Sequence, residues 1–552
     1  MKNNKNTLKI IPIGGLEQIG ANCTMIGSNG EWIVVDLGVS FYDKLGVEVL
    51  TPDITYLNDY KKDIKGIFIT HAHEDHIGAI GYLWKLIKCP IYLTEFPAAV
   101  LKQKISGYQW SDEVPIHIAN KRQRIKVGNF EIEFVGLSHS VLGACGLYIK
   151  TPKGNVFHTG DWKIDETPLL GDLVDTERLI EIGKEGVDCL LCDSTNMLTE
   201  SLIGSEANVR DALERVISKY EHKRVTVTCF SSNVARIDTI FYVARKLKRR
   251  VAIIGRSMYK MLDAVAETSY YTPKFRENVN SILTDEEAMS LPPEKVLLIC
   301  TGSQGEARSA LYKLAKGENK IVKLGGDDVV IFSSKVIPGN EIGIRDLQNM
   351  LLRQNVEIVT TDIEADIHVS GHPNKAAVAK MYDWIKPKTL MPVHGDARML
   401  YAQQAFAKHC GISEVLVAES GDVISYSDGK LEKVSHRDMV FNAVDGNDII
   451  PLNAIPLRDR SVMTYNGHVS VSFVLSSEEV VDEPIVTVQG INTNKKIESR
   501  IKSAISQITR NEVAKGRDVD ILKREITYST KKFMVKHFNK KPLIAVHIHQ
   551  CV

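Results

Sequence analysis

The feature that most constrains this sequence is residues 70–76 (THAHEDH), a run of ligand-type side chains directly after a strand-like apolar segment. The apolar segment covers residues 64–70, and a pattern with helical spacing follows from Ile77. Three imidazoles and a carboxylate packed this closely are costly to bury without partners. Zinc and similar divalent metals bind this combination of ligands. The run therefore predicts a metal site, in preference to a polar loop with unrelated histidines.

Three later segments also place a ligand-type residue just past a strand-like run. With these, the candidate metal ligands are His71, His73, Asp75, His76, His139, Asp161 and His394. One ion would take imidazoles only, from His71, His73 and His139. A second ion would take Asp75, His76 and His394, with the carboxylate of Asp161 between the two ions. A pair of metals held in this way can activate water and clamp both oxygens of a displacement.

Three more residues at strand ends or in nearby turns are candidates for supporting roles. Asp36 ends a buried strand and is either a structural hydrogen-bond acceptor or a partner that orients a metal ligand. A leaving alkoxide needs a proton, which His372 could donate. Asp193 could orient His372 or assist in the proton transfer. His158 is equally well interpreted as a strand residue, so it is left out of the candidate ligands.

Length and composition indicate a multidomain protein of ordinary globular type. The chain has 552 residues, and single cores stop growing at about 250–300 residues. The net charge of +1 argues against a wholesale polyanion binder but leaves room for a local basic surface. The start of the chain lacks the apolar core of a signal peptide, and no run reaches the ~18 apolar residues of a membrane span. We therefore expect a cytoplasmic protein with no membrane contact.

The cysteines support the same expectation. Most of the nine lie in apolar, strand-like runs, as reduced core residues do. Cys189-X-X-Cys192 has the spacing of a metal or redox pair, but no second pair accompanies it. Core packing is therefore the favoured interpretation of this pair.

The pattern of elements predicts the domain organisation. Residues 1–205 alternate strands with ligand-bearing turns and form the first part of one domain. Residues 206–369 alternate strands and helices cleanly, which predicts a parallel sheet covered on both faces and inserted as its own domain. Residues 370–450 return to the first domain. A linker at 451–456 then leads to a small α/β domain at 457–552.

Two surface features have more than one interpretation. Polar turns at 231–233, 301–305 and 333–335 follow strands of the insert and could hold phosphate, or they are ordinary turns. None fits the Gly-x4-Gly-Lys-Ser/Thr loop, so an ATP site is rejected. Residues 495–541 contain 14 Lys and Arg against 5 Asp and Glu, a net charge of +9. This is equally typical of a solvated helix face and of a basic surface for RNA or subunit contact.

The same motifs resemble those of a known family. His71-Ala-His73-Glu-Asp75-His76 resembles the signature of the metallo-β-lactamase fold. The inserted domain, with Asp193-Ser-Thr-Asn, Ser370-Gly-His372 and Val393-His394-Gly, resembles the β-CASP branch, whose members cut nucleic acids. The segments that resemble bacterial ribonuclease J are Gly14-Gly15-Leu16-Glu17-Gln18-Ile19-Gly20, Thr301-Gly-Ser-Gln-Gly-Glu306 and the C-terminal module ending Lys541-Pro-Leu-Ile. The resemblance covers nearly the whole chain.

The resemblance implies an α/β fold, namely a metallo-β-lactamase αββα sandwich with an inserted parallel-sheet β-CASP domain and a small C-terminal α/β domain. It implies a zinc-dependent ribonuclease with endonuclease and 5′-to-3′ exonuclease activity, acting in mRNA decay and rRNA maturation. Two Zn2+ ions per subunit are expected, with Mn2+ or Mg2+ as substitutes. The expected partner is single-stranded RNA with a 5′-monophosphate end, and the expected assembly is a homodimer or homotetramer.

The resemblance also implies roles for individual residues. Asp193, His372 and His394 match the three β-CASP motifs, with His394 as a metal ligand and His372 as a catalytic helper. The residues implied to hold the 5′ phosphate beside the scissile bond are Ser232, Asn233, Ser370, Gly371 and His372. Such a pocket would fit a terminal monophosphate better than a triphosphate. One departure follows His139, where the family usually has a Ser-Ile-Pro-Asp-like segment and this chain has Ser140-Val141-Leu142-Gly143. The shape of that loop, and the role of the acidic residue missing from it, stay open.

Three rival interpretations remain. A DNA nuclease of the same fold is hard to separate by sequence, since RNA choice depends on contacts to the 2′-hydroxyl. A small-ester hydrolase, such as a lactonase or thioesterase, is disfavoured because a small ester needs no second lobe and no extra His394. An RNA-binding scaffold with a dead site is disfavoured because the complete set of candidate ligands is present.

Overall fold

The computed structural model describes residues 7–199, 204–476 and 479–550. The chain divides into two compact units, which are described separately. The first comprises residues 1–41 and 50–439, and the second comprises residues 42–49 and 440–552. Among the described residues, no helix combines the length and the apolar character needed to cross a membrane.

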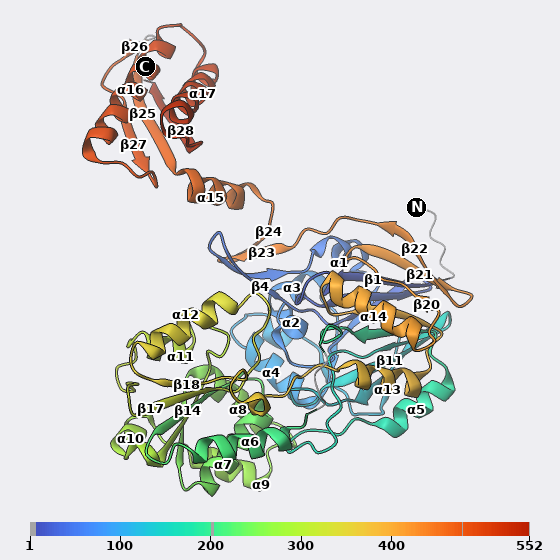
Figure 1. The fold of residues 1–552 in the computed structure, drawn as a ribbon. Helices are drawn as coiled ribbons and strands as arrows, with labels where there is room; N and C mark the ends of the chain where they lie inside the picture. The colour runs from blue at the N-terminus through green and yellow to red at the C-terminus, as the bar shows by residue number, and fades with distance from the viewer. Residues whose placement is uncertain (1–6, 200–203, 477–478, 551–552) are drawn as a thin grey trace. The chain divides into compact units, whose positions relative to one another are not determined.

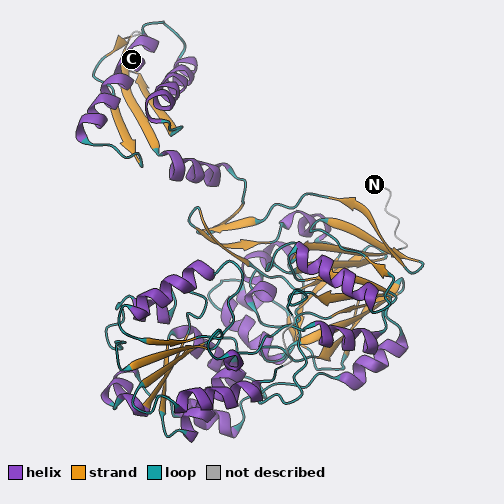
Figure 2. Ribbon diagram, in the orientation of Figure 1, coloured by secondary structure: helices purple, strands orange, loops and turns teal. Residues whose placement is uncertain are grey.

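The first unit contains a sandwich of two β-sheets (Figures 1 and 2). The first sheet has the strand order β22 (Lys430–His436), β21 (Asp422–Ser427), β1 (Leu8–Gly14), β2 (Cys23–Ser28), β3 (Glu31–Val35), β6 (Ile64–Phe68), β7 (Ile91–Leu93) and β8 (Ile116–Ile118). The second has the order β20 (Glu414–Val415), β19 (Thr389–Val393), β13 (Cys189–Asp193), β12 (Gly154–His158), β11 (Cys145–Thr151), β10 (Phe130–Gly136) and β9 (Arg124–Val127). Ile26 and Phe68 of the first sheet share one buried core with Phe134 and Leu147 of the second.

Helices cover the outer faces of this sandwich. On the second sheet these are α5 (Thr176–Glu185), α13 (Lys375–Ile385) and α14 (Ala397–His409). Their apolar residues, such as Ile182 and Met381, pack with Phe157 and Leu190 from the outer face of the sheet. On the first sheet α1 (Ile54–Tyr60) packs its Tyr60 ring against Trp32 of β3, with ring centroids 4.8 Å apart. This αββα layering confirms the predicted fold class.

The insert is a second α/β domain within the first unit. Its five strands are all parallel, in the order β15 (Arg250–Ile254), β16 (Val296–Cys300), β14 (Arg224–Thr228), β17 (Asp328–Phe332) and β18 (Glu357–Val359). One face is covered by α6 (Glu206–Ser218), α7 (Val234–Lys246), α8 (Arg256–Ala266) and α9 (Pro273–Asn280). The other is covered by α10 (Asp285–Ser290), α11 (Ala310–Ala315) and α12 (Glu341–Leu352) (Figure 1). Burial on both faces explains why these strands read as continuous apolar runs.

The pair Cys189 and Cys192 lies in β13, and both side chains are fully buried. Cys189 belongs to the core between the two sheets, whereas Cys192 belongs to the core beneath the outer helices. The two thiols therefore point to opposite faces of one strand, as an odd separation in a strand requires. They cannot share a metal, and core packing is confirmed.

The second unit begins with a small sheet in the order β24 (Asp448–Pro451), β23 (Asn442–Asp445), β5 (Val47–Thr51) and β4 (Ser40–Lys44). Helix α15 (Ile455–Asn466) follows, so only residues 452–454 of the expected linker lie outside regular elements. The rest of the unit is a sheet of β25 (His468–Ser476), β26 (Glu479–Val480), β27 (Ile485–Gln489) and β28 (Leu543–Gln550) with helices α16 (Lys495–Val513) and α17 (Val519–Phe538). Val471 and Phe473 of β25 pack with Ile505 of α16 and Ile526 of α17.

Candidate metal centre

The first four candidate ligands lie where β6 gives way to helix α2 (Glu74–Ile77). His73 is extended at the N-cap position, and Asp75 and His76 lie in the helical turn. The main chain of this turn packs tightly against residues 37–39. A Cβ atom on Gly38 would come within 1.6 Å of the carbonyl oxygen of Asp75. Only glycine fits there, and this close approach fixes the direction in which the turn leaves the strand.

Distant strand ends converge on this turn, and Asp161 lies at the centre. Its Oδ2 atom is 3.2 Å from Nε2 of His76, 3.6 Å from Nε2 of His394 and 3.7 Å from Nε2 of His71. Nε2 of His139 lies 3.9 Å from the same oxygen. The residues predicted to approach the early histidines therefore do so.

Three ligand-type groups share Asp161: two are made of the predicted ligands, and a third joins it to Asp193, His372 and His394. The first is His71, His73, His139 and Asp161, and the second is Asp75, His76, Asp161 and His394. Within each group the candidate ligand atoms lie within 4.8 Å of one another. This is the division of ligands that the sequence predicts, and a mixture of imidazoles and carboxylates suits divalent metals.

Unpartnered polar atoms at the centre fit a metal. Nε2 of His71 and Oδ1 of Asp161 are buried and have no hydrogen-bond partner within the part of the chain that the structure describes. Nε2 of His139 and Nδ1 of His73 approach to 3.0 Å. Buried polar atoms without partners are costly, and cations between these converging lone pairs would satisfy them.

Hydrogen bonds to Nδ1 fix how several of these imidazoles point. His76 donates from Nδ1 to Asp36 at 2.7 Å, and His139 donates from Nδ1 to the carbonyl of Gly371 at 2.6 Å. Thr70 Oγ1 lies 3.0 Å from Nδ1 of His71 and donates to Asp36 at 2.8 Å. Each ring therefore turns its Nε2 towards the cluster, as partners of metal-binding histidines do. Asp36 is thus both a structural acceptor and an orienting partner.

The backbone at two of these positions is in the left-handed region. φ is +60° at Asp36 and +54° at His394. Such conformations are uncommon for residues other than glycine and cost about 1–3 kcal/mol each. Asp36 is held by its bonds to Thr70 and His76, and His394 by Nδ1, which lies 2.7 Å from Oγ1 of Thr195.

Electrostatics separate the histidines into two classes. Burial lowers the pKa of His73 to about 4 and holds the pKa of His71 and His139 well below the usual value. Burial also disfavours the charged form of His394, but the carboxylates of Asp161, Asp193 and Asp75 together outweigh it and raise the pKa of His394 to about 10. Neutral imidazoles are the form that binds metal. A metal cation bound near Asp161 would take the place of the positive charge on protonated His394.

A second cluster adjoins the first through His372. Its Nδ1 lies 2.8 Å from Oδ2 of Asp193, and its ring stacks on that of His394 at 5.3 Å between centroids. Burial opposes protonation of His372, but the carboxylates of Asp193 and Asp161 raise its pKa above the usual value. The imidazolium form of His372 is therefore favoured beside the metal ligands.

Several supporting residues carry no signal in the sequence that assigns their contacts. Thr195 donates to Oδ1 of Asp193 at 2.7 Å, so it joins that carboxylate to His394. Asn196 donates to Oγ of Ser370 at 2.8 Å and to the carbonyl of His372 at 2.9 Å. The sequence motif at 193–196 contains both residues, but their partners lie far along the chain. Asn22 Nδ2, which lies 3.0 Å from Nε2 of His76, belongs to no candidate motif.

The residues implied to hold phosphate have additional structural roles. Asn233 caps α7, because its Oδ1 accepts from the backbone N–H of Arg236 at 2.9 Å. Ser370 Oγ accepts from the backbone N–H of His372 at 3.2 Å. Ser232 precedes the cap and is partly exposed. A Cβ on Gly371 would lie 2.8 Å from the His139 ring, so this glycine allows the main chain to approach the site.

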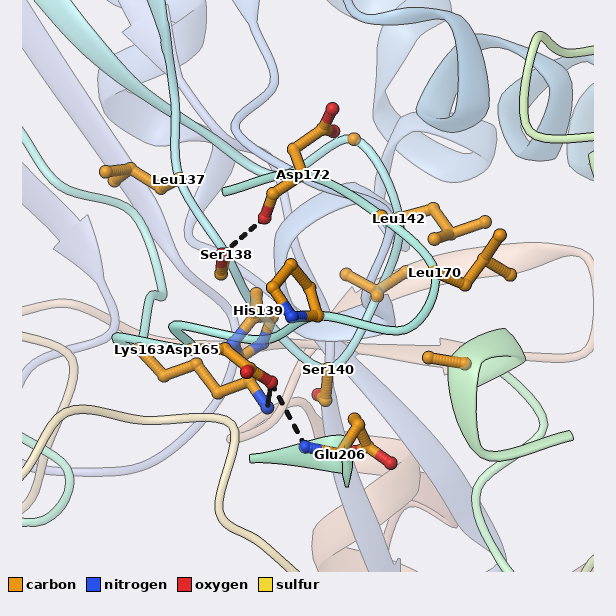
Figure 3. A pocket seen from close by; sticks show the side chains of 15 residues that line it. Leu137, Ser138, His139, Ser140, Leu142, Lys163, Asp165, Leu170, Asp172 and Glu206 are labelled. Carbon is orange, nitrogen blue, oxygen red and sulfur yellow. Dashed lines mark hydrogen bonds and ion pairs between the residues drawn. The ribbon is translucent and has the colours of Figure 1, made fainter. Parts of the chain in front are cut away.

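A buried ionic network joins the two domains of the first unit, and Figure 3 shows its beginning at Lys163, Asp165 and Glu206. Asp165 accepts from Lys163 Nζ at 3.1 Å and from the backbone N–H of Glu206 at 3.2 Å. The carboxylate of Glu206 binds Arg236 at 2.9 and 3.0 Å, and Arg236 donates to Oγ of Ser333 at 2.6 Å. Arg236, whose backbone N–H bonds to Asn233, also contacts the carbonyl of Ile367 at 3.4 Å. The network therefore connects both segments of the implied phosphate pocket.

The loop that departs from the family pattern is packed by apolar side chains. Val141 and Leu142 are buried and share a core cluster with Phe96 of α4 (Glu95–Ile105) and with helices of the insert. Gly143 has φ of +69°, and its carbonyl accepts from Thr94 Oγ1 at 2.7 Å. Apolar packing and a glycine turn thus shape this loop, while His139 at its start keeps its place among the ligands.

Known families match successive parts of the chain. Residues 17–216 match the metallo-beta-lactamase superfamily, and residues 222–351 match "Ribonuclease J, beta-CASP domain". Residues 357–416 match "Zn-dependent metallo-hydrolase RNA specificity domain", and residues 455–551 match "Ribonuclease J C-terminal domain". The chain also resembles in fold a crystal structure of a protein of unknown function from Enterococcus faecalis V583, with a TM-score of 0.55 and 17% identity over 76% of this chain and all of that one.

Ribonucleases J from several bacteria are similar to this chain over nearly its whole length. Ribonuclease J of Sinorhizobium meliloti is 36% identical, with 98% of this chain and 97% of that protein covered. Ribonuclease J of Helicobacter pylori strain 26695 is 32% identical over 99% of this chain and 80% of that protein, and that of Corynebacterium glutamicum is 32% identical over 98% and 75%. With the convergence of ligands described above, these similarities show that the chain belongs to the ribonuclease J family, whose metallo-β-lactamase and β-CASP domains make it a metal-dependent hydrolytic ribonuclease.

Proposed function

We propose that this protein hydrolyses phosphodiester bonds of single-stranded RNA at the cluster centred on Asp161, with two Zn2+ ions, or Mn2+ or Mg2+ in their place. The observation that carries the proposal is the approach of His71, His76, His139 and His394 to one carboxylate oxygen of Asp161. Two divalent ions in such a site supply Lewis acidity, which lets water ionise near neutral pH and stabilises charge on the phosphate. We assign the metal ligands as His71, His73, Asp75, His76, His139, Asp161 and His394.

The chain's own residues supply the proton that the leaving group needs. We assign this role to His372, because the carboxylate of Asp193 at 2.8 Å favours its protonated form. Asp193 engages Nδ1, so donation to the leaving alkoxide falls to Nε2. Asp193 in turn is oriented by Thr195, which donates to it at 2.7 Å. A small ester would not need the inserted β-CASP domain. The presence of this domain therefore supports a polymeric substrate.

The phosphate beside the scissile bond is assigned to Ser232, Asn233, Ser370, Gly371 and His372. Ser232 and Asn233 lie at the N-terminus of α7, where backbone N–H groups and the helix dipole favour an anion. Arg236 supports this placement, because it bonds to the segment of Asn233 and to the segment leading into Ser370. A pocket closed around one terminal phosphate accounts for exonuclease action from a 5′ end. Endonuclease action uses the same metal centre on internal bonds.

The cellular setting follows from the same proposal. We infer roles in mRNA decay and rRNA maturation, in the cytoplasm, and assembly as a homodimer or homotetramer. The cysteines described as buried, from Cys23 to Cys300, are all free thiols, which fits a reducing compartment.

The first test is digestion of matched RNA and DNA strands. We expect the purified protein to degrade end-labelled single-stranded RNA, to lose that activity on treatment with a chelator, and to regain it with Zn2+ or Mn2+. Because contacts to the 2′-hydroxyl distinguish the two substrates, the DNA strand of the same sequence should be cleaved at least tenfold more slowly. Equal rates on both strands would show that DNA is also a substrate. Cleavage that persists with the chelator would show that the metal centre does not carry out the reaction. Metal analysis of the active protein identifies the ions.

The second test varies the 5′ end. Exonucleolytic decay of 5′-monophosphorylated RNA should be at least about tenfold faster than decay of 5′-triphosphorylated RNA, because a bulky triphosphate should fit worse than a monophosphate in the proposed pocket. Endonucleolytic cleavage of a circular RNA serves as the control, because it has no 5′ end to bind. Equal exonuclease rates on the two linear RNAs would exclude the phosphate pocket while leaving the metal centre in place.

A further inference from the structure

Helix α17 in the second unit carries a row of cations on the side opposite its buried face. Leu522, Ile526, Thr530 and Met534 are buried and face the core of the unit. The exposed row begins two residues later along the helix, at the spacing of successive turns. We call it the α17 stripe, and its members are Arg524, Tyr528, Lys531, Lys532 and Lys536.

Few acidic residues lie near the stripe in the sequence. The last 27 residues of the chain, from Ile526 on, contain no Asp or Glu. Glu525 pairs instead with Arg517 at 3.3 Å, and Glu512 of the neighbouring α16 pairs with Lys515 at 2.7 Å. Within the described residues, no ion pair neutralises the four cations of the stripe.

Ordinary helix stability does not explain this arrangement. Cations in the last turn of a helix are favoured by its dipole, but among the stripe cations only Lys536 lies there. Arg524, Lys531 and Lys532 lie in earlier turns, where the dipole gives no preference. The segment 495–541 carries +9, which leaves −8 for the rest of a chain whose total is +1. Positive charge is therefore concentrated on this part of the second unit.

An aromatic ring lies within the row of cations. Tyr528 is 64% exposed, between Arg524 one turn before it and Lys531 and Lys532 one turn after it. Exposed aromatic rings flanked by cations are typical of surfaces that bind single-stranded nucleic acid, because bases stack on the ring while cations meet the phosphates. From Arg524 to Lys536 the stripe extends about 18 Å, enough for several nucleotides.

We propose that the α17 stripe of the second unit is a binding surface for the single-stranded RNA substrate, separate from the metal centre, with Tyr528 stacking on a base and the four cations contacting phosphates. This inference rests on the ribonuclease activity proposed above. Both units belong to one chain, so RNA held on the stripe stays at high local concentration for the metal centre. The stripe reads no sequence, since its contacts are to the backbone and to the face of a base.

The test measures the salt dependence of binding in the full-length chain. A His76→Ala background prevents cleavage, and the probe is a single-stranded RNA of roughly 30 nucleotides labelled at its 3′ end, with binding followed by anisotropy. The variant combines Arg524→Gln, Lys531→Gln and Lys532→Gln. Loss of three phosphate contacts should reduce the slope of log K against log salt by about 2 and weaken binding by about tenfold or more at low salt. The matched control, with Lys61→Gln, Lys62→Gln and Lys430→Gln, changes the net charge equally and should leave the slope unchanged.

Two further measurements complete the test. Tyr528→Ala should weaken RNA binding by about tenfold, whereas Tyr528→Phe, which keeps the ring, should not. In the active enzyme, the triple variant should raise KM for long RNA without changing kcat, and should leave cleavage of a short oligonucleotide unchanged. An unchanged salt slope would overturn the proposal, as would a slope change accompanied by dissociation of the protein in sedimentation, which would assign the stripe to subunit contact. If the unsubstituted protein cleaves no RNA at all, the proposed function fails, whereas the binding slopes test the stripe separately.

Discussion

His76→Ala should abolish RNA cleavage while the protein stays folded. Nε2 of His76 lies 3.2 Å from Asp161 and 3.5 Å from Asp75, between the two carboxylates assigned to the second ion. Its loss removes a ligand and also leaves Asp36 without one of its partners. Because metal catalysis contributes several kcal/mol, kcat/KM should fall by about 10³-fold or more. Digestion of labelled RNA, together with metal analysis, measures the effect.

The control for this variant is His222→Ala, because His222 is an exposed histidine in the turn before β14. It should keep full activity and metal content. Thermal unfolding of the His76 variant without metal, compared with the unsubstituted protein without metal, separates loss of a ligand from loss of the fold. Full activity of His76→Ala with unchanged metal content would remove His76 from the site.

His372→Ala should lower kcat on RNA by about 10²–10⁴-fold and leave the bound metal in place. This is the usual contribution of a general acid, and His372 is assigned that role rather than ligation. His394→Ala is the informative comparison, because His394 lies 3.2 Å from Asp75 and should lose metal as well as activity. Single-turnover cleavage and metal analysis of both variants distinguish the two roles.

A substrate with a better leaving group tests the mechanism of the His372 effect. The p-nitrophenolate released from bis(p-nitrophenyl) phosphate leaves without a proton, so His372→Ala should reduce its hydrolysis by less than about tenfold. Asp193→Asn keeps a hydrogen-bond acceptor beside Nδ1 of His372 but removes the charge, and should give an intermediate loss on RNA. Equal losses on RNA and on the activated ester would show that His372 positions the site instead of donating a proton.

The ionic network behind the site relates these effects to the fold. Arg236 is fully buried and bonds to Glu206, Ser333 and the carbonyl of Ile367. Removing either Arg236 or Glu206 would leave the other as an uncompensated buried charge, which is strongly destabilising. The charges of Arg236 and Glu206 are therefore both needed to hold the metallo-β-lactamase and β-CASP domains together. This joint holds the segment that leads into Ser370 and His372.

The sequence alone determined the types of residue at the site and many local elements. The side-chain pattern of the sequence predicts a helix over 375–385 and a strand over 389–393, and α13 and β19 have these bounds in the structure. The sequence also predicts mostly helical segments at 494–514 and 518–539, and these are α16 and α17 with small shifts at their ends. Such elements can be predicted because apolar side chains recur along neighbouring residues with the period of a helix or a strand. The position of ligand-type residues just past strand-like runs gives the candidate metal ligands, and the family resemblance adds the phosphate-binding residues.

Only the tertiary structure decided how these local pieces meet. β13 pairs in parallel with β19, some 200 residues later, and this pairing places Asp193 beside Val393 and the adjoining His394. The carbonyl of Gly371 that orients His139, and the amide of Asn22 at His76, likewise act across long stretches of chain. Residues 42–49 join the second unit, which no local pattern indicates. The physical reason is that periodicity records which face of an element is buried, whereas the partner on that face is chosen by packing between segments far apart in the chain.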